Sequence, residues 1–203
     1  MVRQAPADKY DERRNQLAES ALRTLGELGY ARTSLREIAA NSEFSHGVVH
    51  YYFDDKVELI VYCVRYYKAR CVTRYDEVIA SAATAGELVE GFAAKLVETI
   101  SDEAPMHRLW YDLRTQSMFE TSLREAVTMI DRTLAEMIWR VVSRYAELSG
   151  VPAGRTPAAA YGLLDGIFQQ ALLGHLTGRA GALDDLADQV RELMPFLLEP
   201  AAA

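Results

Sequence analysis

Residues 33–59 read TSLREIAANSEFSHGVVHYYFDDKVEL, and this stretch decides the fold. Ser34 and Glu37 have the spacing of a capping box, which predicts a short helix that ends near Asn41. Ser45 can cap a second short helix that runs to about Tyr51. Two short helices joined by a turn of 3–4 residues form a helix-turn-helix.

The rest of the chain also follows helical periodicity. An apolar stripe predicts a helix from about Tyr10 to Leu28 that stops at Gly29, and a second box, Asp55 with Glu58, opens a long helix over 56–82. Further helices are expected near 85–100, 104–117, 120–149, 157–177 and 183–198. We therefore predict an all-α protein of about nine helices, with a three-helix domain at 1–55 and a helical domain at 56–203.

Composition excludes some classes of protein and leaves others open. The net charge is −7, but residues 1–56 hold eight basic and nine acidic residues, so the acid excess lies in the larger C-terminal part. Global charge says little about a local surface that faces phosphates. The N-terminal stretch lacks the apolar core of a secretory signal, and apolar runs are too short to cross a membrane. We expect a soluble cytoplasmic protein without membrane contact.

Catalytic and metal-binding patterns are missing from the sequence. We find no glycine-rich phosphate loop, no nucleophile elbow and no HExxH motif, so we expect no enzyme, no catalytic residues and no cofactor. Cys63 and Cys71 are two helical turns apart, too far for a disulfide, and two ligands do not make a zinc site. Glu103 and His107 share an i, i+4 relation but lack a third ligand, so no metal site is expected.

The second helix of the pair carries side chains suited to DNA. Hydroxyls can bond phosphate oxygens, glycine allows close backbone approach, and His46, Val48 and Tyr51 can read base edges. The candidate DNA-binding residues are Thr33, Ser34, Ser45, His46, Gly47, Val48, His50, Tyr51, Tyr52 and Lys56. Tyr52 and Lys56 are expected to anchor the DNA backbone from the far side.

These residues resemble the DNA-binding domain of the TetR (tetracycline-repressor-like) family. The family pattern Thr-x-x-x-Ile-Ala, a Gly-Val-Ser turn and Gly-x-Leu-Tyr-x-Tyr-Phe-x-x-Lys-x-x-Leu appears here from Ser34 to Leu59. Three positions depart from it. Glu43 replaces the usual glycine, Val48 stands at an often polar position, and His50 replaces a common tyrosine. These departures mark individual contacts that should differ from those of relatives.

The resemblance implies a C-terminal domain that binds a small-molecule effector and forms a homodimer through the last two long helices. The helix over 158–176 supports this locally, because small residues along one face let helices approach closely. The candidate interface residues are Gly162, Gly166, Ile167, Phe168 and Ala171. The alternative is that this helix is simply the central helix of one chain.

The helix near 104–117 is the candidate wall of an effector pocket. Aromatic side chains with a few polar groups are typical of small-molecule sites. The candidate ligand-binding residues are His107, Trp110, Tyr111, Arg114, Met118, Phe119, Tyr66 and Phe92. Arg114 can meet an acidic ligand or serve in a structural ion pair, and the sequence leaves both open.

Two functions remain. The first is a ligand-responsive regulator, typically a repressor, that binds a double-stranded DNA operator as a dimer. The second is a helical-bundle interaction protein with a degenerate DNA-binding head, which Glu43 and His50 would mark. Sequence-specific, salt-sensitive DNA binding separates the two.

Overall fold

A computed structural model describes residues 6–199. The described residues form nine α-helices and no β-strand, apart from one isolated bridge between Ala153 and Leu198. They divide into two compact units. The first holds the chain up to Arg70 together with Arg108–Ile130, and the second holds Cys71–His107 with the residues from Asp131 onward. The all-α prediction is confirmed, whereas the proposed domain boundary at residue 55 stays a prediction.

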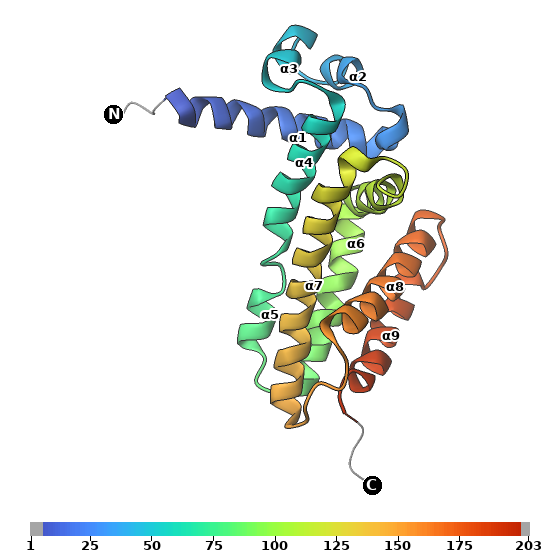
Figure 1. Ribbon diagram of the computed structural model, residues 1–203. Coiled ribbons are helices and arrows are strands. Elements are labelled where there is room, and N and C mark those ends of the chain that lie inside the picture. Colours follow the sequence, from blue (N-terminus) through green and yellow to red (C-terminus); the bar gives the residue numbers. More distant parts are fainter. Residues whose placement is uncertain (1–5, 200–203) are drawn as a thin grey trace. The chain divides into compact units, whose positions relative to one another are not determined.

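The first unit begins with three helices around one apolar core: α1 (Pro6–Arg32), α2 (Leu35–Ala40) and α3 (His46–Tyr52). Leu17 and Leu25 of α1 are fully buried, as are Ile38 of α2 and Val49 of α3. The expected apolar stripe of the first helix is therefore its core face. Figure 1 shows α2 and α3 side by side next to α1.

Gly29 ends the regular part of α1. Its φ of 76° and ψ of 171° lie outside the helical region, and a positive φ is adopted readily only by glycine. The few residues beyond it return to helical hydrogen bonding as far as Arg32. The predicted stop at Gly29 is thus confirmed as a break in the helix.

Helix α4 (Lys56–Cys71) starts where the sequence predicts and ends earlier. Asp55 Oδ1 accepts from the Glu58 N–H at 2.8 Å, while Glu58 Oε2 accepts from the Asp54 N–H at 2.8 Å, one residue before the expected partner. The predicted helix over 56–82 is wrong, because residues 72–75 form a turn before α5 (Asp76–Ser81).

Helix α6 (Ala85–Gln116) joins the two helices expected at 85–100 and 104–117. The sequence places a break at Ala104-Pro105, and the structure has a kink there instead, with Glu103 at φ −128° and ψ 22°. Proline removes one backbone donor and crowds the preceding turn, so a kink beside Pro105 is its ordinary consequence. Helix α6 contributes to both units.

The second unit is completed by part of α7 (Thr121–Ser149) and by α8 (Pro157–Leu176) and α9 (Ala182–Phe196). Helices α8 and α9 pack side by side (Figure 1). Leu186, Val190 and Met194 recur every four residues on α9 and are fully buried. Thr156 caps α8 and Pro157 opens it, as expected for a proline whose missing N–H costs nothing in the first turn.

Cys63 and Cys71 are both free and buried. Within residues 6–199, no helix is long and apolar enough to cross a membrane. No group of three or more metal-ligating side chains occurs in the same described part of the chain.

Candidate nucleic-acid interface

The first helix of the helix-turn-helix is fixed by its predicted capping box. Ser34 Oγ accepts from the Glu37 N–H at 3.2 Å, and Glu37 Oε2 accepts from the Ser34 N–H at 2.7 Å. Both halves of the box are therefore present. Such reciprocal bonds satisfy amides that a helix start otherwise leaves without partners. A helix of only six residues depends on this support.

Helix α3 presents a continuous polar and aromatic surface. Ser45 Oγ accepts from the Val48 N–H at 3.3 Å and starts the helix. His46, Gly47 and His50 are exposed, and Tyr51 is 72% exposed. The imidazole rings of the two histidines lie 4.4 Å apart. These exposed residues are the part of the motif that can reach base edges.

Three other candidates contribute less surface than the sequence indicates. Thr33 is 2% exposed, and its hydroxyl donates to the Gly29 carbonyl at 2.7 Å, so it has little free surface and its phosphate contact stays a prediction. Val48 and Tyr52 are half-buried. The local sequence pattern does not reveal that Thr33 closes the end of α1.

Lys56 is engaged inside the first unit. Its ammonium donates to the Tyr30 carbonyl and lies 4.0 Å from the centroid of the Tyr30 ring. Burial lowers the pKa of Lys56 from its ordinary value, although the carboxylates of Glu120, Glu37 and Asp112 oppose that shift. The side chain ties the start of α4 to the end of α1, and its role as a phosphate anchor stays a prediction.

Helix α1 supplies neighbours of α3 that the motif did not identify. The Tyr10 ring lies 6.4 Å from that of Tyr51 and 4.9 Å from that of Tyr52. Arg14 pairs with Glu58 at 2.7 Å, and its guanidinium stacks 4.6 Å from the Phe53 ring. These contacts join residues about forty positions apart, so helical spacing cannot predict them.

Arg108 and Asp112 of α6, together with Glu120 just before α7, hold the end of α1, and we call this set the α1 latch. Asp112 Oδ2 accepts from the Tyr30 N–H at 2.7 Å, and Arg108 donates to the Gly26 carbonyl. The Tyr30 hydroxyl donates to Glu120. Burial and this carboxylate raise the pKa of Tyr30. The latch joins the platform of the helix-turn-helix to α6.

The predicted effector-site residues of the first unit differ from one another in burial. Trp110 is 2% exposed, while Met118 and Phe119 are 71% and 81% exposed in the turn after α6. The Tyr66 hydroxyl donates to Glu19 at 2.7 Å. The Arg114 guanidinium lies 6.0 Å from the Trp110 ring and 5.8 Å from the Tyr111 ring. Trp110, Tyr111 and Arg114 thus form one cluster.

The remaining two candidates belong to the second unit. Phe92 is fully buried, with its ring 4.9 Å from that of Tyr75. His107 is 7% exposed and lies 5.1 Å from Phe168.

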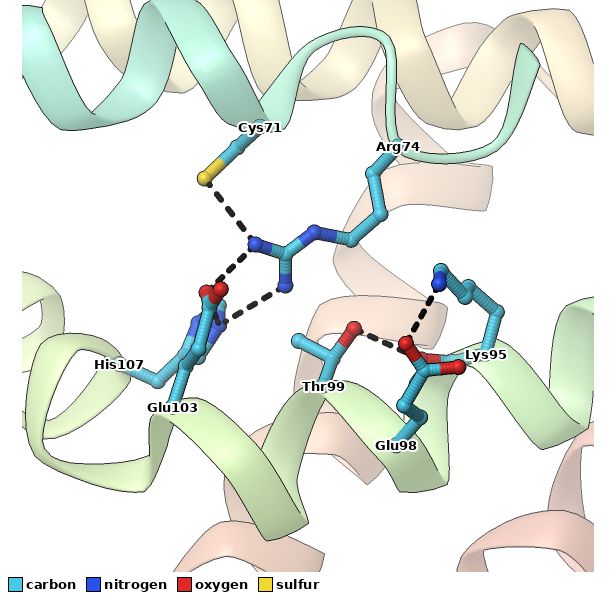
Figure 2. Close-up of polar contacts among 7 residues, drawn as sticks. All are labelled: Cys71, Arg74, Lys95, Glu98, Thr99, Glu103 and His107. Carbon is cyan, nitrogen blue, oxygen red and sulfur yellow. Dashed lines mark hydrogen bonds and ion pairs between the residues drawn. The ribbon is translucent and has the colours of Figure 1, made fainter. Parts of the chain in front are cut away.

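A polar cluster surrounds His107 at the kink of α6. Figure 2 shows Arg74 pointing toward Glu103 and His107. Arg74 Nη2 donates to Glu103 Oε2 at 2.5 Å, and Arg74 Nη1 lies 3.5 Å from His107 Nε2. The same guanidinium contacts Cys71 Sγ at 3.5 Å. The guanidinium therefore links the turn after α4 to the irregular residue Glu103. The ring of His107 contacts both this ion pair and the Phe168 ring.

The interface candidates of α8 divide between two faces. Gly162 and Gly166 are exposed and Ile167 is half-buried, whereas Phe168 and Ala171 are buried within the chain itself. Leu173, 57% exposed, shares the outward face with the two glycines. The outward residues remain candidates for a dimer contact, while Phe168 and Ala171 have little exposed surface, at 8% and 4%.

Comparisons with known proteins agree with this architecture. Residues 17–63 match the family model "Bacterial regulatory proteins, tetR family". The chain is 30% identical over 197 residues to the HTH-type transcriptional regulator BetI of Burkholderia thailandensis, covering 94% of this chain and 95% of that protein. A BetI protein of Burkholderia mallei is 29% identical over 188 residues, covering 90% and 93%.

Solved structures show the same fold at lower identity. A TetR transcription regulator from Haloarcula marismortui has a TM-score of 0.74 and 18% identity, covering 93% of this chain and all of that one. A transcriptional regulator from Saccharomonospora viridis, solved in complex with choline, has a TM-score of 0.75 and 18% identity, covering 94% of this chain and all of that one.

Proposed function

This chain belongs to the tetR family of bacterial regulatory proteins, and from that premise we propose that it represses transcription as a cytoplasmic homodimer released from its operator by a small-molecule effector. It is a transcriptional regulator, and in our proposal it has no catalytic activity. The observation that carries the proposal is the exposed surface of α3, where His46, His50 and Tyr51 project from a capped, packed helix.

The exposed residues of α3 suit readout in the major groove of double-stranded DNA. Imidazole nitrogens can donate to or accept from base edges, and the Tyr51 ring can contact a thymine methyl. Gly47 has no atom within 4 Å of the place of a Cβ, so the DNA backbone can approach it closely. The hydroxyls of Ser34 and Ser45 lie at the starts of α2 and α3, where phosphates can reach them.

The test begins with selection of binding sequences from random double-stranded DNA, followed by fluorescence anisotropy. Tyr51→Ala and His46→Ala should each weaken binding of the selected site about 5- to 100-fold and relax the base preference. Arg132→Ala is the matched control, because this arginine is exposed on α7 and should leave binding unchanged. If the wild-type chain shows only sequence-independent binding, the interaction-protein alternative with a degenerate head replaces the regulator.

Dimer formation is proposed through the outward face of α8. Leu173 and the two glycines of that face would be covered by a second copy, and symmetric contacts of this kind are the commonest in homodimers. The two α3 helices would then enter successive major grooves, about 34–36 Å apart. Leu173→Glu should give a monomer in size-exclusion chromatography with light scattering. A dimer of unchanged stability would locate the interface elsewhere.

The effector response is proposed to pass through residues 108–116 of α6. Arg108 and Asp112 hold the end of α1, whereas Trp110 and Arg114 lie on the opposite side of the same helix. A ligand that binds beside Trp110 can move this segment and therefore the platform of α3. Its effect is limited by its difference in affinity for the two states.

Arg108→Ala tests this route. The variant should still bind the effector but should lose part of the ligand-dependent release from DNA. An unchanged release would show that another element carries the signal.

A further inference from the structure

Trp110 combines deep burial with an unused donor. Its side chain is 2% exposed, and its Nε1 has no hydrogen-bond partner among the described residues. An indole nitrogen is a donor only, so a partner must supply an acceptor. Buried polar groups are almost always hydrogen-bonded in folded proteins. The exception at Trp110 therefore points to a ligand atom that the chain itself does not provide.

Two cations lie against the same indole ring. Lys68 Nζ is 5.0 Å from the Trp110 ring centroid, and the Arg114 guanidinium is 6.0 Å from it. Lys68 is 5% exposed, so its charge is buried beside the ring. The neighbouring tyrosine rings are engaged in the same way, Tyr67 by Lys68 at 5.5 Å and Tyr111 by Arg114 at 5.8 Å.

This arrangement opposes binding of a quaternary ammonium such as choline. A quaternary ammonium is recognised by aromatic rings whose faces are open to contact with the cation. Here lysine and arginine already lie over the rings, and like charges at short distance repel each other. The cluster instead favours a negatively charged acceptor, because such a group can accept a hydrogen bond from the indole N–H while two cations lie nearby.

We propose that Lys68, Trp110 and Arg114 bind the carboxylate of a small organic acid, which is the effector of this regulator. The inference rests on the proposed effector-controlled function and deepens it by naming the ligand class. Trp110 Nε1 donates to one carboxylate oxygen, and the guanidinium and ammonium supply the charge. The aromatic rings of the cluster pack against the apolar part of the acid.

A single-tryptophan protein provides the direct assay. The chain has two tryptophans, so Trp139→Phe leaves Trp110 as the only indole reporter. Hexanoate and benzoate are titrated against this full-length variant, with hexanamide, benzamide and choline chloride as neutral and cationic comparisons. We expect the acids to change the Trp110 fluorescence and to bind at least about tenfold more tightly than their amides, while choline leaves the signal unchanged.

Substitutions in the cluster test the assigned groups by calorimetry. Trp110→Phe keeps an aromatic ring but removes the donor, and Arg114→Met keeps the length but removes the charge. Each should weaken carboxylate binding by about tenfold or more. Arg132→Met is the matched control for lost positive charge, since this arginine is exposed on α7, and it should bind like the wild type.

Three results would overturn the assignment. They are choline binding as tight as that of the acids, carboxylate binding that survives Trp110→Phe and Arg114→Met, and no response to either acid at about 10 mM, where a simple fragment should register. DNA binding is measured separately without ligand. If carboxylates bind but the chain recognises no DNA sequence, the proposed repressor fails while the binding site stands.

Discussion

Asp112 offers a quantitative test of the α1 latch. Its Oδ2 accepts the backbone N–H of Tyr30 at 2.7 Å, directly after the irregular Gly29. Asp112→Ala removes a charged acceptor of this amide at a partly buried place. A hydrogen bond to a charged group is worth about 1.5–3 kcal/mol, and partial exposure favours the lower part of that range. We expect a loss of about 2 kcal/mol in the free energy of unfolding.

The measurement is urea unfolding followed by circular dichroism, with thermal unfolding in parallel. For a chain of this length, 2 kcal/mol corresponds to a fall in Tm of about 4–8 °C. Asp112→Asn retains an amide oxygen as acceptor and should lose only about half as much. Asp102→Ala is the control, because Asp102 is an exposed aspartate on the same helix, and its effect should stay within about 0.5 kcal/mol. Equal stabilities of the two alanine variants would refute the latch.

Three further substitutions test other parts of the structure. Gly29→Ala should cost about 1–2 kcal/mol in urea unfolding because φ is 76°, whereas Gly86→Ala, with no atom near its Cβ position, should cost nothing. Lys56→Met should lower Tm, because it removes the ammonium that donates to the Tyr30 carbonyl; a salt dependence of DNA binding whose slope falls by about 0.9 would confirm the predicted phosphate contact, and an unchanged slope would contradict it. Burial raises the pKa of Tyr75 above 10.0, so its neutral form contributes stability that is present below pH 10.0 and lost above it. The difference in the free energy of unfolding between the wild type and Tyr75→Phe should therefore fall by up to about 1.4 kcal/mol per pH unit above pH 10.0. A difference that does not change with pH would contradict this.

Local chemistry was sufficient to predict much of the fold. The capping box at Ser34 and Glu37, the start of α3 at Ser45, the interruption at Gly29 and the proline at the start of α8 all depend on residues within one turn. Each of these signals acts through hydrogen bonds or dihedral angles that neighbours in sequence determine. These local predictions are correct for that reason.

Distant contacts account for the errors in helix boundaries. The turn at 72–75 allows Tyr75 to be buried against Phe92 and Arg74 to reach Glu103, and neither partner is visible from the periodicity of α4. In α6, the sequence predicts a break at Pro105, but the chain accommodates the proline through the irregular backbone of Glu103. Tertiary packing overrides local propensity at both places.

The candidate site was predictable only in part, for the same reason. The spacing of the motif identified the exposed residues of α3, but it could not show that Thr33 is buried or that Lys56 holds the Tyr30 carbonyl. The contact of Tyr10 with Tyr51 and Tyr52 arises from packing of α1, which lies far away in sequence. The spacing of residues in the sequence indicates which of them share a face of a helix. The packing of other elements against that face determines which side chains remain free to contact DNA.

The lengths of α2 and α3 have a consequence for how the protein opens. At six and seven residues, both are far shorter than the helices of about 12–15 residues that persist alone in water. Their backbone amides are therefore protected only as long as they stay packed on α1. In native-state hydrogen exchange, α3 should open by local unfolding at a lower free energy than α9, whose inner face is fully buried at Leu186, Val190 and Met194. Warming would then weaken the proposed operator binding at temperatures where most of the chain is still folded.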